Sequence, residues 1–187
     1  TFLPTDYLGD VAEPAPEPTE PTEPEKPVDW FADVIAAAVK VKASMDGKVL
    51  PSSIQVGTTT VTPGQFLYLA CQVTVGINKG QTTGTLTVPK ANEPENPSGS
   101  ATGKVYLSDY VAMAQKIITF VHDYEQPPNY ATSSSIGAVH YYDVVHMYTK
   151  ILNYYSSNGE LPNYNTVEGW RGTVKAMPAS APAAEKV

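Results

Sequence analysis

The sequence predicts a mainly α fold of tandem helix–short β-hairpin–helix repeats, preceded by an extended proline-rich tail. One segment recurs along the chain: MAQKIITFVHDYEQPPNY at 113–130 returns as MYTKILNYYSSNGELPNY at 147–164, an offset of 34 residues. A weaker third copy, AAAVKVKASMDGKVLPSS at 36–53, matches within one residue of slippage. A fixed offset is typical of repeat proteins, in which each unit buries its apolar face only against its neighbours. Such proteins more often present binding surfaces than pockets for chemistry.

The charge of the chain is distributed unevenly. The net charge of the 187 residues is −7, and all of it falls within residues 1–30, because the acids and bases of the remainder balance. The sequence therefore lacks the basic surface of proteins that bind nucleic acids, and no nucleic acid partner is expected. No apolar run is long enough to span a bilayer, so no transmembrane segment is expected either.

The N-terminal region combines an apolar start with an acidic spacer. Residues 12–27 read AEPAPEPTEPTEPEKP, and proline at every second or third position prevents a helix and favours polyproline II. Such a tract is a semi-rigid spacer between a wall or membrane and a folded head. Ahead of it we predict an assembly surface that docks head to tail on a neighbouring copy of the chain. It consists of Phe2, Leu3, Tyr7, Leu8 and Val11.

The sequence up to residue 77 predicts one helix, one hairpin and a second helix. Apolar residues recur on one stripe over about 30–45, and 54–61 reads as a short hairpin with a turn near Gly57. The second helix has a clear start, because Thr62 and Gln65 have the spacing of a capping box.

The second half repeats this pattern after a linker rich in threonine, glycine and proline. We expect one helix that Ser108 caps and Pro127 ends, and another over about 140–156. The predicted regions are the start and spacer 1–29, a first repeat block 30–77, the linker 78–104, a second repeat block of two overlapping units 105–172, and a C-terminal tail 173–187.

The helix ends resemble a known family. The motifs are NGELPNY at 158–164, PNY at 128–130 and QFLYL at 65–69, and in order and spacing they resemble the pseudomurein-binding repeats of methanogenic archaea. The resemblance covers about residues 30–170. The first copy departs from it, because LPSS at 50–53 has no Asn-Tyr.

The resemblance implies a non-catalytic module on the outside of the cell, at the cell wall or cell surface. Such a module would bind pseudomurein, as cell-wall glycan or peptide, and anchor or target an attached protein. Repeats of this kind occur in adhesin-like proteins and beside wall hydrolases. The alternative left open by the sequence is a structural subunit of an extracellular filament or adhesin stalk, assembled through the apolar N-terminal segment.

The Pro-Asn-Tyr ends and the tyrosine-rich last helix supply the candidate ligand-binding residues. Tyrosine offers a flat face to sugar rings, and asparagine offers paired donors and acceptors. The competing interpretation is structural, because proline ends a helix and the tyrosine after it can pack on the next hairpin. The candidates are Asn129, Tyr130, Asn163, Tyr164, Tyr141, Tyr142 and Tyr154.

No residue pattern predicts catalysis, a metal site or a cofactor. Cys71 lies in the apolar stretch QFLYLACQVTV and reads as a buried inert thiol rather than a nucleophile. His122, His140 and His146 are in the other block, and no Cys or carboxylate cluster joins them. We therefore expect a protein that is not an enzyme and that needs no cofactor.

Overall fold

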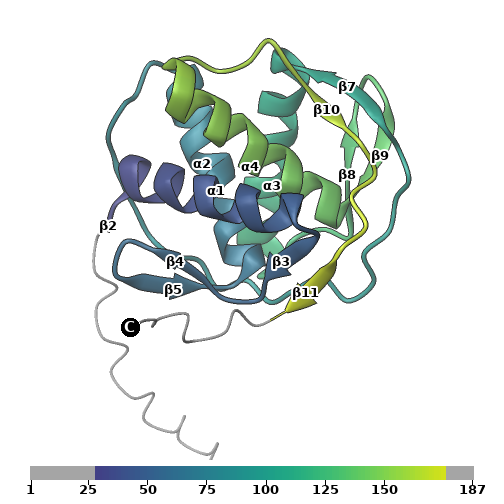
Figure 1. Cartoon of the computed structure of the whole chain (residues 1–187), viewed down its shortest axis with the longest axis horizontal. Coiled ribbons are helices and arrows are strands. Elements are labelled where there is room, and N and C mark those ends of the chain that lie inside the picture. Colours follow the sequence, from purple (N-terminus) through teal and green to yellow (C-terminus); the bar gives the residue numbers. More distant parts are fainter. Residues whose placement is uncertain (1–27, 176–187) are drawn as a thin grey trace, which may run out of the picture.

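The structure, a computed structural model, describes residues 28–175, in which four helices are gathered at the centre and short strands run along one side and one end (Figure 1). The helices are α1 (Trp30–Asp46), α2 (Pro63–Asn78), α3 (Leu107–Tyr124) and α4 (Tyr141–Asn158). The strands are β2 (Val28–Asp29), β3 (Val49–Pro51), β4 (Ile54–Val56), β5 (Thr59–Val61), β6 (Thr85–Leu86), β7 (Gly103–Tyr106), β8 (Tyr130–Ser133), β9 (Gly137–His140), β10 (Tyr164–Val167) and β11 (Thr173–Lys175). The five apolar residues of the predicted assembly surface lie outside the described residues.

The predicted fold class is wrong: the protein is mixed α/β, with 47% helix and 21% strand, and not a mainly α stack of tandem repeats. Its ten described strands form five separate two-stranded sheets. Each strand is only two to four residues long, so the alternating pattern that marks a strand in a sequence is too short to detect. Three of these sheets also pair segments far apart in the chain, which a local pattern cannot show.

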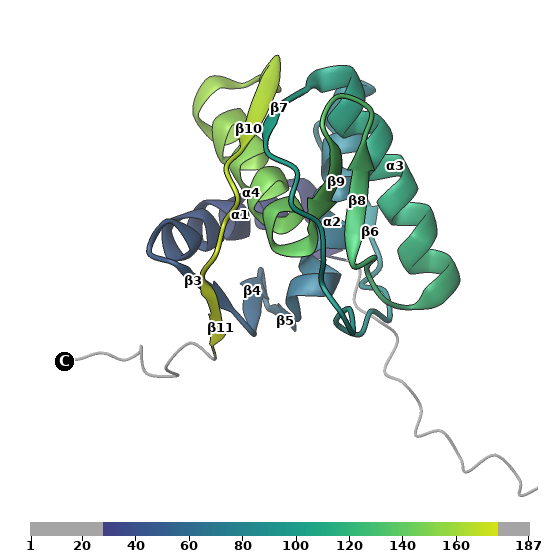
Figure 2. The same cartoon turned by 90° about the vertical axis from the view of Figure 1, so that its right-hand side faces the viewer.

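The recurring segments close on each other instead of continuing as an open stack. Strand β8 pairs with β9 as a hairpin, with Tyr130 opposite His140. Strand β10 pairs with β7, with Tyr164 opposite Tyr106, and both members of this pair are shifted by 34 residues, in opposite directions, from those of the hairpin. The two pairs lie side by side, flanked by α3 on one side and α4 on the other (Figure 2). The last of the similar segments therefore completes its sheet with the strand that precedes α3.

One hydrophobic core holds residues of both predicted repeat blocks. Helix α1 packs across α4, and α2 packs on α3 and α4 (Figure 1). Buried side chains from all four helices belong to the same cluster. The 78–104 segment follows the surface of this core, where the amides of Asn92, Ser98 and Ala101 donate to the carbonyls of Glu125, Asn129 and Ala138.

Close backbone approach explains one glycine in that segment. Gly99 has φ +111°, and a Cβ there would lie 2.9 Å from the carbonyl oxygen of Ala138 and from the amide nitrogen of His140. Only glycine combines this dihedral with this proximity. The segment can therefore lie directly against β9.

Two of the four helix starts differ in how they are capped. The predicted capping box of α2 is confirmed, because Gln65 N donates to Thr62 Oγ1 and Thr62 N donates to Gln65 Oε1. The predicted cap of α3 is wrong: the helix begins at Leu107, one residue before Ser108, and its N-cap residue makes no side-chain hydrogen bond. The strand β7 leads directly into α3, so the sheet fixes this end.

An aspartate in the first turn of α1, α3 and α4 faces the turn of the neighbouring sheet. Asp109 accepts hydrogen bonds in the β8–β9 turn, and Asp143 accepts one from the amide of Trp170, after β10. In the first block, a Cβ on Gly57 would lie 2.5 Å from Asp33 Oδ2, so the glycine leaves room for the carboxylate. The same residue type thus joins a helix start to a turn three times.

Asp109 shows what this contact does. Its carboxylate accepts from Ser133 Oγ at 2.5 Å and from the amides of Ser134 and Ser135 at 3.0 and 3.1 Å. Burial by itself would raise the pKa of Asp109, but these hydrogen bonds favour the ionised form and lower its pKa. The charged carboxylate is therefore part of the folded structure.

We predict that Asp109→Ala lowers the free energy of unfolding at neutral pH by about 1–3 kcal/mol, because two turn amides lose their acceptor. A lowered pKa in the folded state means that the contribution of Asp109 is complete above its unfolded pKa, about 3.9, and is lost as the pH falls through the folded value. Urea denaturation at several pH values measures both effects. Asp123→Ala, at an exposed site on the same helix, is the control and should change stability by about 0.5 kcal/mol or less. An equal loss in both variants would contradict the role assigned to Asp109.

Candidate functional site

Each Pro-Asn-Tyr segment turns back along the helix that precedes it. Helix α3 ends at Glu125, whose left-handed φ of 55° reverses the chain, and α4 ends at Gly159 with φ 74°. The strands that follow, β8 and β10, then lie against α3 and α4 respectively. This return leaves a groove between each helix and its own strand.

The groove between α3 and β8 has a volume of about 400 Å³. Its helical wall is a single stripe with the spacing i, i+3, i+4, i+7, so all four side chains lie on one face. These are Met113, Lys116, Ile117 and Phe120, and the opposite wall is Pro128, Asn129, Tyr130, Ala131 and Thr132. The groove is mainly apolar, with aromatic rings on both walls.

The groove between α4 and β10 is built in the same way and has a volume of about 520 Å³. Lys150 and Tyr154 take the places of Lys116 and Phe120, at the offset of 34 residues. It is more polar than the first groove, because asparagine or serine replaces several apolar positions. Its lining is Lys42, Lys150, Asn153, Tyr154, Ser157, Asn158, Pro162, Asn163, Tyr164, Asn165 and Thr166.

A third, smaller groove of about 210 Å³ lies between α1 and β4, in the weak third copy. Lys40 stands there at the position of Lys116 in the slipped alignment, but the groove contains no aromatic side chain. Its lining is Ala37, Lys40, Val41, Ser44, Pro51, Ser53, Ile54 and Gln55. None of these residues was among the predicted ligand-binding set. Only the helical stripe, read together with the copy itself, could have indicated them.

The two Pro-Asn-Tyr motifs place their tyrosines at the surface and use part of their asparagines for structure. Tyr130 is 48% exposed and Tyr164 44% exposed, and each lines its groove. Asn129 Oδ1 accepts from the amide of Asn96 at 2.9 Å, so this side chain anchors the segment before β7. Asn163 is exposed and lines the α4–β10 groove.

Tyr164 is further held by its neighbours across the sheet. Its ring centroid lies 5.9 Å from that of Tyr106, and the Lys104 ammonium lies 4.5 Å from the same centroid, on the ring face. A cation over a tyrosine face is attracted by the ring quadrupole. The ring of Tyr164 is therefore held in a defined orientation.

The tyrosines of α4 divide into three environments. Tyr154 is 40% exposed and lines the α4–β10 groove. Tyr142 is half-buried, and its ring meets that of Trp170 edge-on at 5.7 Å. Tyr141, predicted to meet solvent or ligand, is instead buried, and its hydroxyl donates to Glu93 Oε1 at 2.7 Å. Burial, followed by the charge of Glu93, raises the pKa of Tyr141.

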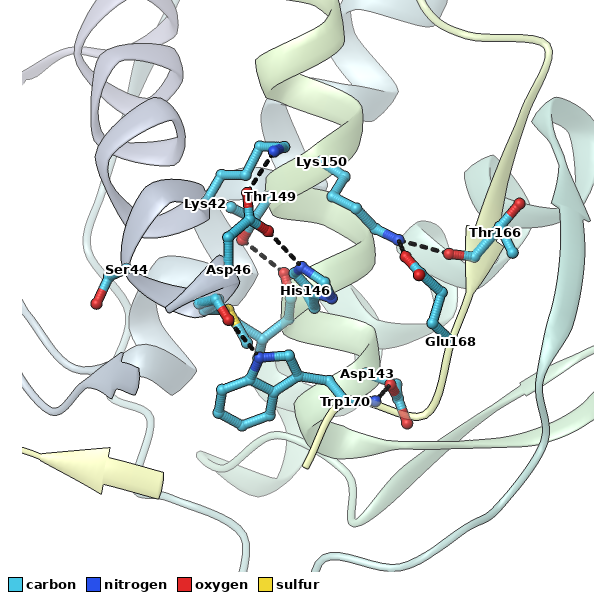
Figure 3. Close-up of polar contacts among 12 residues, drawn as sticks. Lys42, Ser44, Asp46, Asp143, His146, Thr149, Lys150, Thr166, Glu168 and Trp170 are labelled. Carbon is cyan, nitrogen blue, oxygen red and sulfur yellow. Dashed lines mark hydrogen bonds and ion pairs between the residues drawn. The ribbon is translucent and has the colours of Figure 1, made fainter. Parts of the chain in front are cut away.

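A second polar cluster lies where the end of α1 meets α4 (Figure 3). Asp46 forms an ion pair with Lys42 at 2.6 Å and approaches His146 Nε2 at 3.5 Å. Trp170 closes the cluster from below and donates its indole Nε1–H to the carbonyl of Met45 at 2.7 Å. This cluster joins the last described loop to the first helix.

The cluster does not have the geometry of a nucleophilic site. The Ser44 hydroxyl donates to the carbonyl of Val49 at 2.8 Å and points away from Asp46 (Figure 3). The Thr149 hydroxyl donates to the carbonyl of Val145 at 2.6 Å. Both hydroxyls are therefore engaged with backbone oxygens rather than directed at His146, as a hydroxyl nucleophile must be at its base.

The other residues weighed for chemistry have structural places. Cys71 is fully buried, as predicted, and burial raises the pKa of its thiol well above the ordinary value. His140 is the N-cap of α4 and accepts from the amide of Tyr142 through Nδ1 at 3.1 Å. Within residues 28–175, no three His, Cys, Asp or Glu side chains are grouped so as to hold a metal ion.

Comparison of this chain with models of protein families, with curated proteins and with solved structures gives no match. Among the helices of the described part, none combines the length and the apolar character that crossing a bilayer requires.

We predict that His146 makes the stability of the protein pH-dependent near neutrality. Burial and then the nearby Lys150 ammonium lower the pKa of His146, against the opposing effect of Asp46 and Glu168. The unfolded chain, in which histidine titrates near pH 6.5, therefore binds the proton more strongly than the folded chain. The free energy of unfolding should fall as the pH drops below about 6.5.

Urea denaturation at a series of pH values between about 5 and 7.5 tests this prediction for wild type and His146→Gln. The variant should lose much of the decline seen with wild type over this range, because glutamine does not titrate. His122→Gln, at an exposed site on α3, should keep the wild-type decline. Unchanged pH dependence in His146→Gln would show that other groups cause it.

Proposed function

We propose that this protein is a non-catalytic module of the cell surface that binds the polymer of an archaeal cell wall, pseudomurein, and so anchors or targets what is attached to it. The choice of polymer rests on the resemblance of the PNY and QFLYL motifs to pseudomurein-binding repeats. One structural observation carries the proposal. The two motif-bearing segments each build a groove of the same construction, with an aromatic side chain on the helix and a tyrosine on the strand.

The shape and the lining of these grooves fit a segment of polymer. Volumes of about 400 and 520 Å³ lie within the range of ordinary ligand sites. Phe120 and Tyr130 line the first groove and Tyr154 and Tyr164 the second, so each offers aromatic rings on which a sugar or an aliphatic side chain can pack. Two similar grooves on one chain also allow one polymer to be bound at two places, which raises the avidity.

The composition of the groove walls favours binding over turnover. General acid–base catalysis needs a titratable side chain within hydrogen-bond reach of the reacting group. Among the described residues that line the two larger grooves, none is Asp, Glu, His or Cys. The lining offers hydrogen-bonding amides, hydroxyls and lysines, which suit recognition.

We predict that Tyr130→Ala and Tyr164→Ala each weaken retention of the protein on isolated pseudomurein sacculi. Truncation of a central aromatic at an interface typically costs about 2 kcal/mol or more, so the Kd should rise by about tenfold or more. The double variant should bind more weakly still. Both tyrosines are exposed, so the circular dichroism spectrum should stay that of the wild type.

Tyr124→Ala is the matched control, because Tyr124 is an aromatic on α3 that is 64% exposed and lies outside all three grooves. It should bind sacculi as the wild type does. Bacterial peptidoglycan serves as the second ligand and should retain less protein. The proposal fails if the double variant binds as well as the wild type, or if the chain by itself releases soluble fragments from the sacculi.

A further inference from the structure

A lysine occupies the same place in each of the three grooves. Lys116 in the α3–β8 groove, Lys150 in the α4–β10 groove and Lys40 in the α1–β4 groove all come from the helical wall. No acidic side chain of the described part of the chain lines any of these grooves. In a protein with more acids than bases, this places a positive charge specifically where a ligand would lie.

The three lysines differ in what surrounds them. The Lys150 ammonium lies 3.2 Å from Glu168 Oε2 and also donates to the carbonyl of Thr166, so its charge is already compensated (Figure 3). Lys116 is exposed and forms no ion pair or hydrogen bond within residues 28–175. The α3–β8 groove therefore has an uncompensated positive charge, and the α4–β10 groove does not.

The position of Lys116 within its groove specifies the chemistry of the occupant. The neighbouring positions of the helical wall are Met113, Ile117 and Phe120, so the ammonium stands at the edge of an apolar surface. A ligand that fits this wall has an apolar face, such as the face of a sugar ring or an aliphatic chain. A ligand that also satisfies the ammonium carries an anionic oxygen beside that face, and a carboxylate provides it.

We infer that the α3–β8 groove recognises a carboxylate on the wall polymer, with Lys116 as its partner and Phe120 and Tyr130 against the adjoining apolar face. This inference rests on the proposed function. The carboxylate belongs either to an acidic sugar or to a peptide of the wall, which present the same group to the lysine. The α4–β10 groove binds a neutral polar part of the polymer, because Glu168 already neutralises Lys150.

The test compares sacculi with intact carboxyl groups and sacculi whose carboxyls have been converted to amides with carbodiimide and ammonia. For the wild type, amidation should raise the Kd about fivefold, the size of an exposed ion pair. Lys116→Gln should bind intact sacculi about fivefold more weakly than wild type and should be insensitive to amidation. Lys116→Arg should keep most of the affinity and the sensitivity.

Lys150→Gln is the matched control at the equivalent position, and it should remain as sensitive to amidation as the wild type. Raising the salt concentration should reduce the difference between wild type and Lys116→Gln, because salt screens exposed charges. The glycan and peptide fractions of solubilised sacculi, used as separate competitors, distinguish the two sources of the carboxylate. The fraction that competes with wild type but not with Lys116→Gln carries it.

The outcomes separate this inference from the function on which it rests. Equal binding of the wild type to intact and amidated sacculi overturns carboxylate recognition and leaves wall binding in place. Sensitivity to amidation that persists in Lys116→Gln assigns the contact to another residue and overturns the inference as well. No binding of the wild type to any sacculi overturns the proposed function together with the inference.

Discussion

The pairing of β10 with β7 determines how the second half of the described chain is arranged. It brings the strand after α4 against the strand before α3, in the register that β8 and β9 adopt with each other. Two further contacts depend on this pairing. The Tyr110 hydroxyl donates to the carbonyl of Pro162 at 2.5 Å, and the amide of Leu107 donates to the carbonyl of Asn163 at 2.9 Å. Both fix the loop that leads into the α4–β10 groove. The groove is thus a product of the closed sheet and not of the motif alone.

The loop that follows β10 extends this closure to the first half of the chain. Trp170 is buried, and its indole reaches the carbonyl of Met45 at the end of α1, while its amide donates to Asp143 at the start of α4. Strand β11 then pairs in parallel with β3, with Val174 opposite Leu50. A buried indole that is satisfied by a helix carbonyl both fills space and ends the helix. The two halves therefore share one core.

Local signals in the sequence predicted the local elements, and contacts between distant segments account for the rest. The capping box at Thr62 and the turn at Gly57 were readable because their partners lie within a few residues. The overall class was not, because β7 and β10 are far apart in sequence and each is too short to show alternation. In the candidate site, the sequence indicated Tyr130 and Tyr164 at the strand wall but not the helical wall, whose stripe reads equally well as core. It placed Tyr141 at the surface because the acceptor Glu93, which allows its burial, is distant in sequence.

Closure of this kind has a consequence for how the chain acquires its structure. An open solenoid can fold from any unit, since each contact joins neighbours, and its folding is correspondingly local. Here β3 must wait for β11 and β7 must wait for β10, so these pairings close long loops late and at an entropic cost that slows folding. During synthesis from the N-terminal side, α1 and the β4–β5 hairpin would exist before the tryptophan that covers the end of α1. The order of events is therefore set by the last strand to arrive.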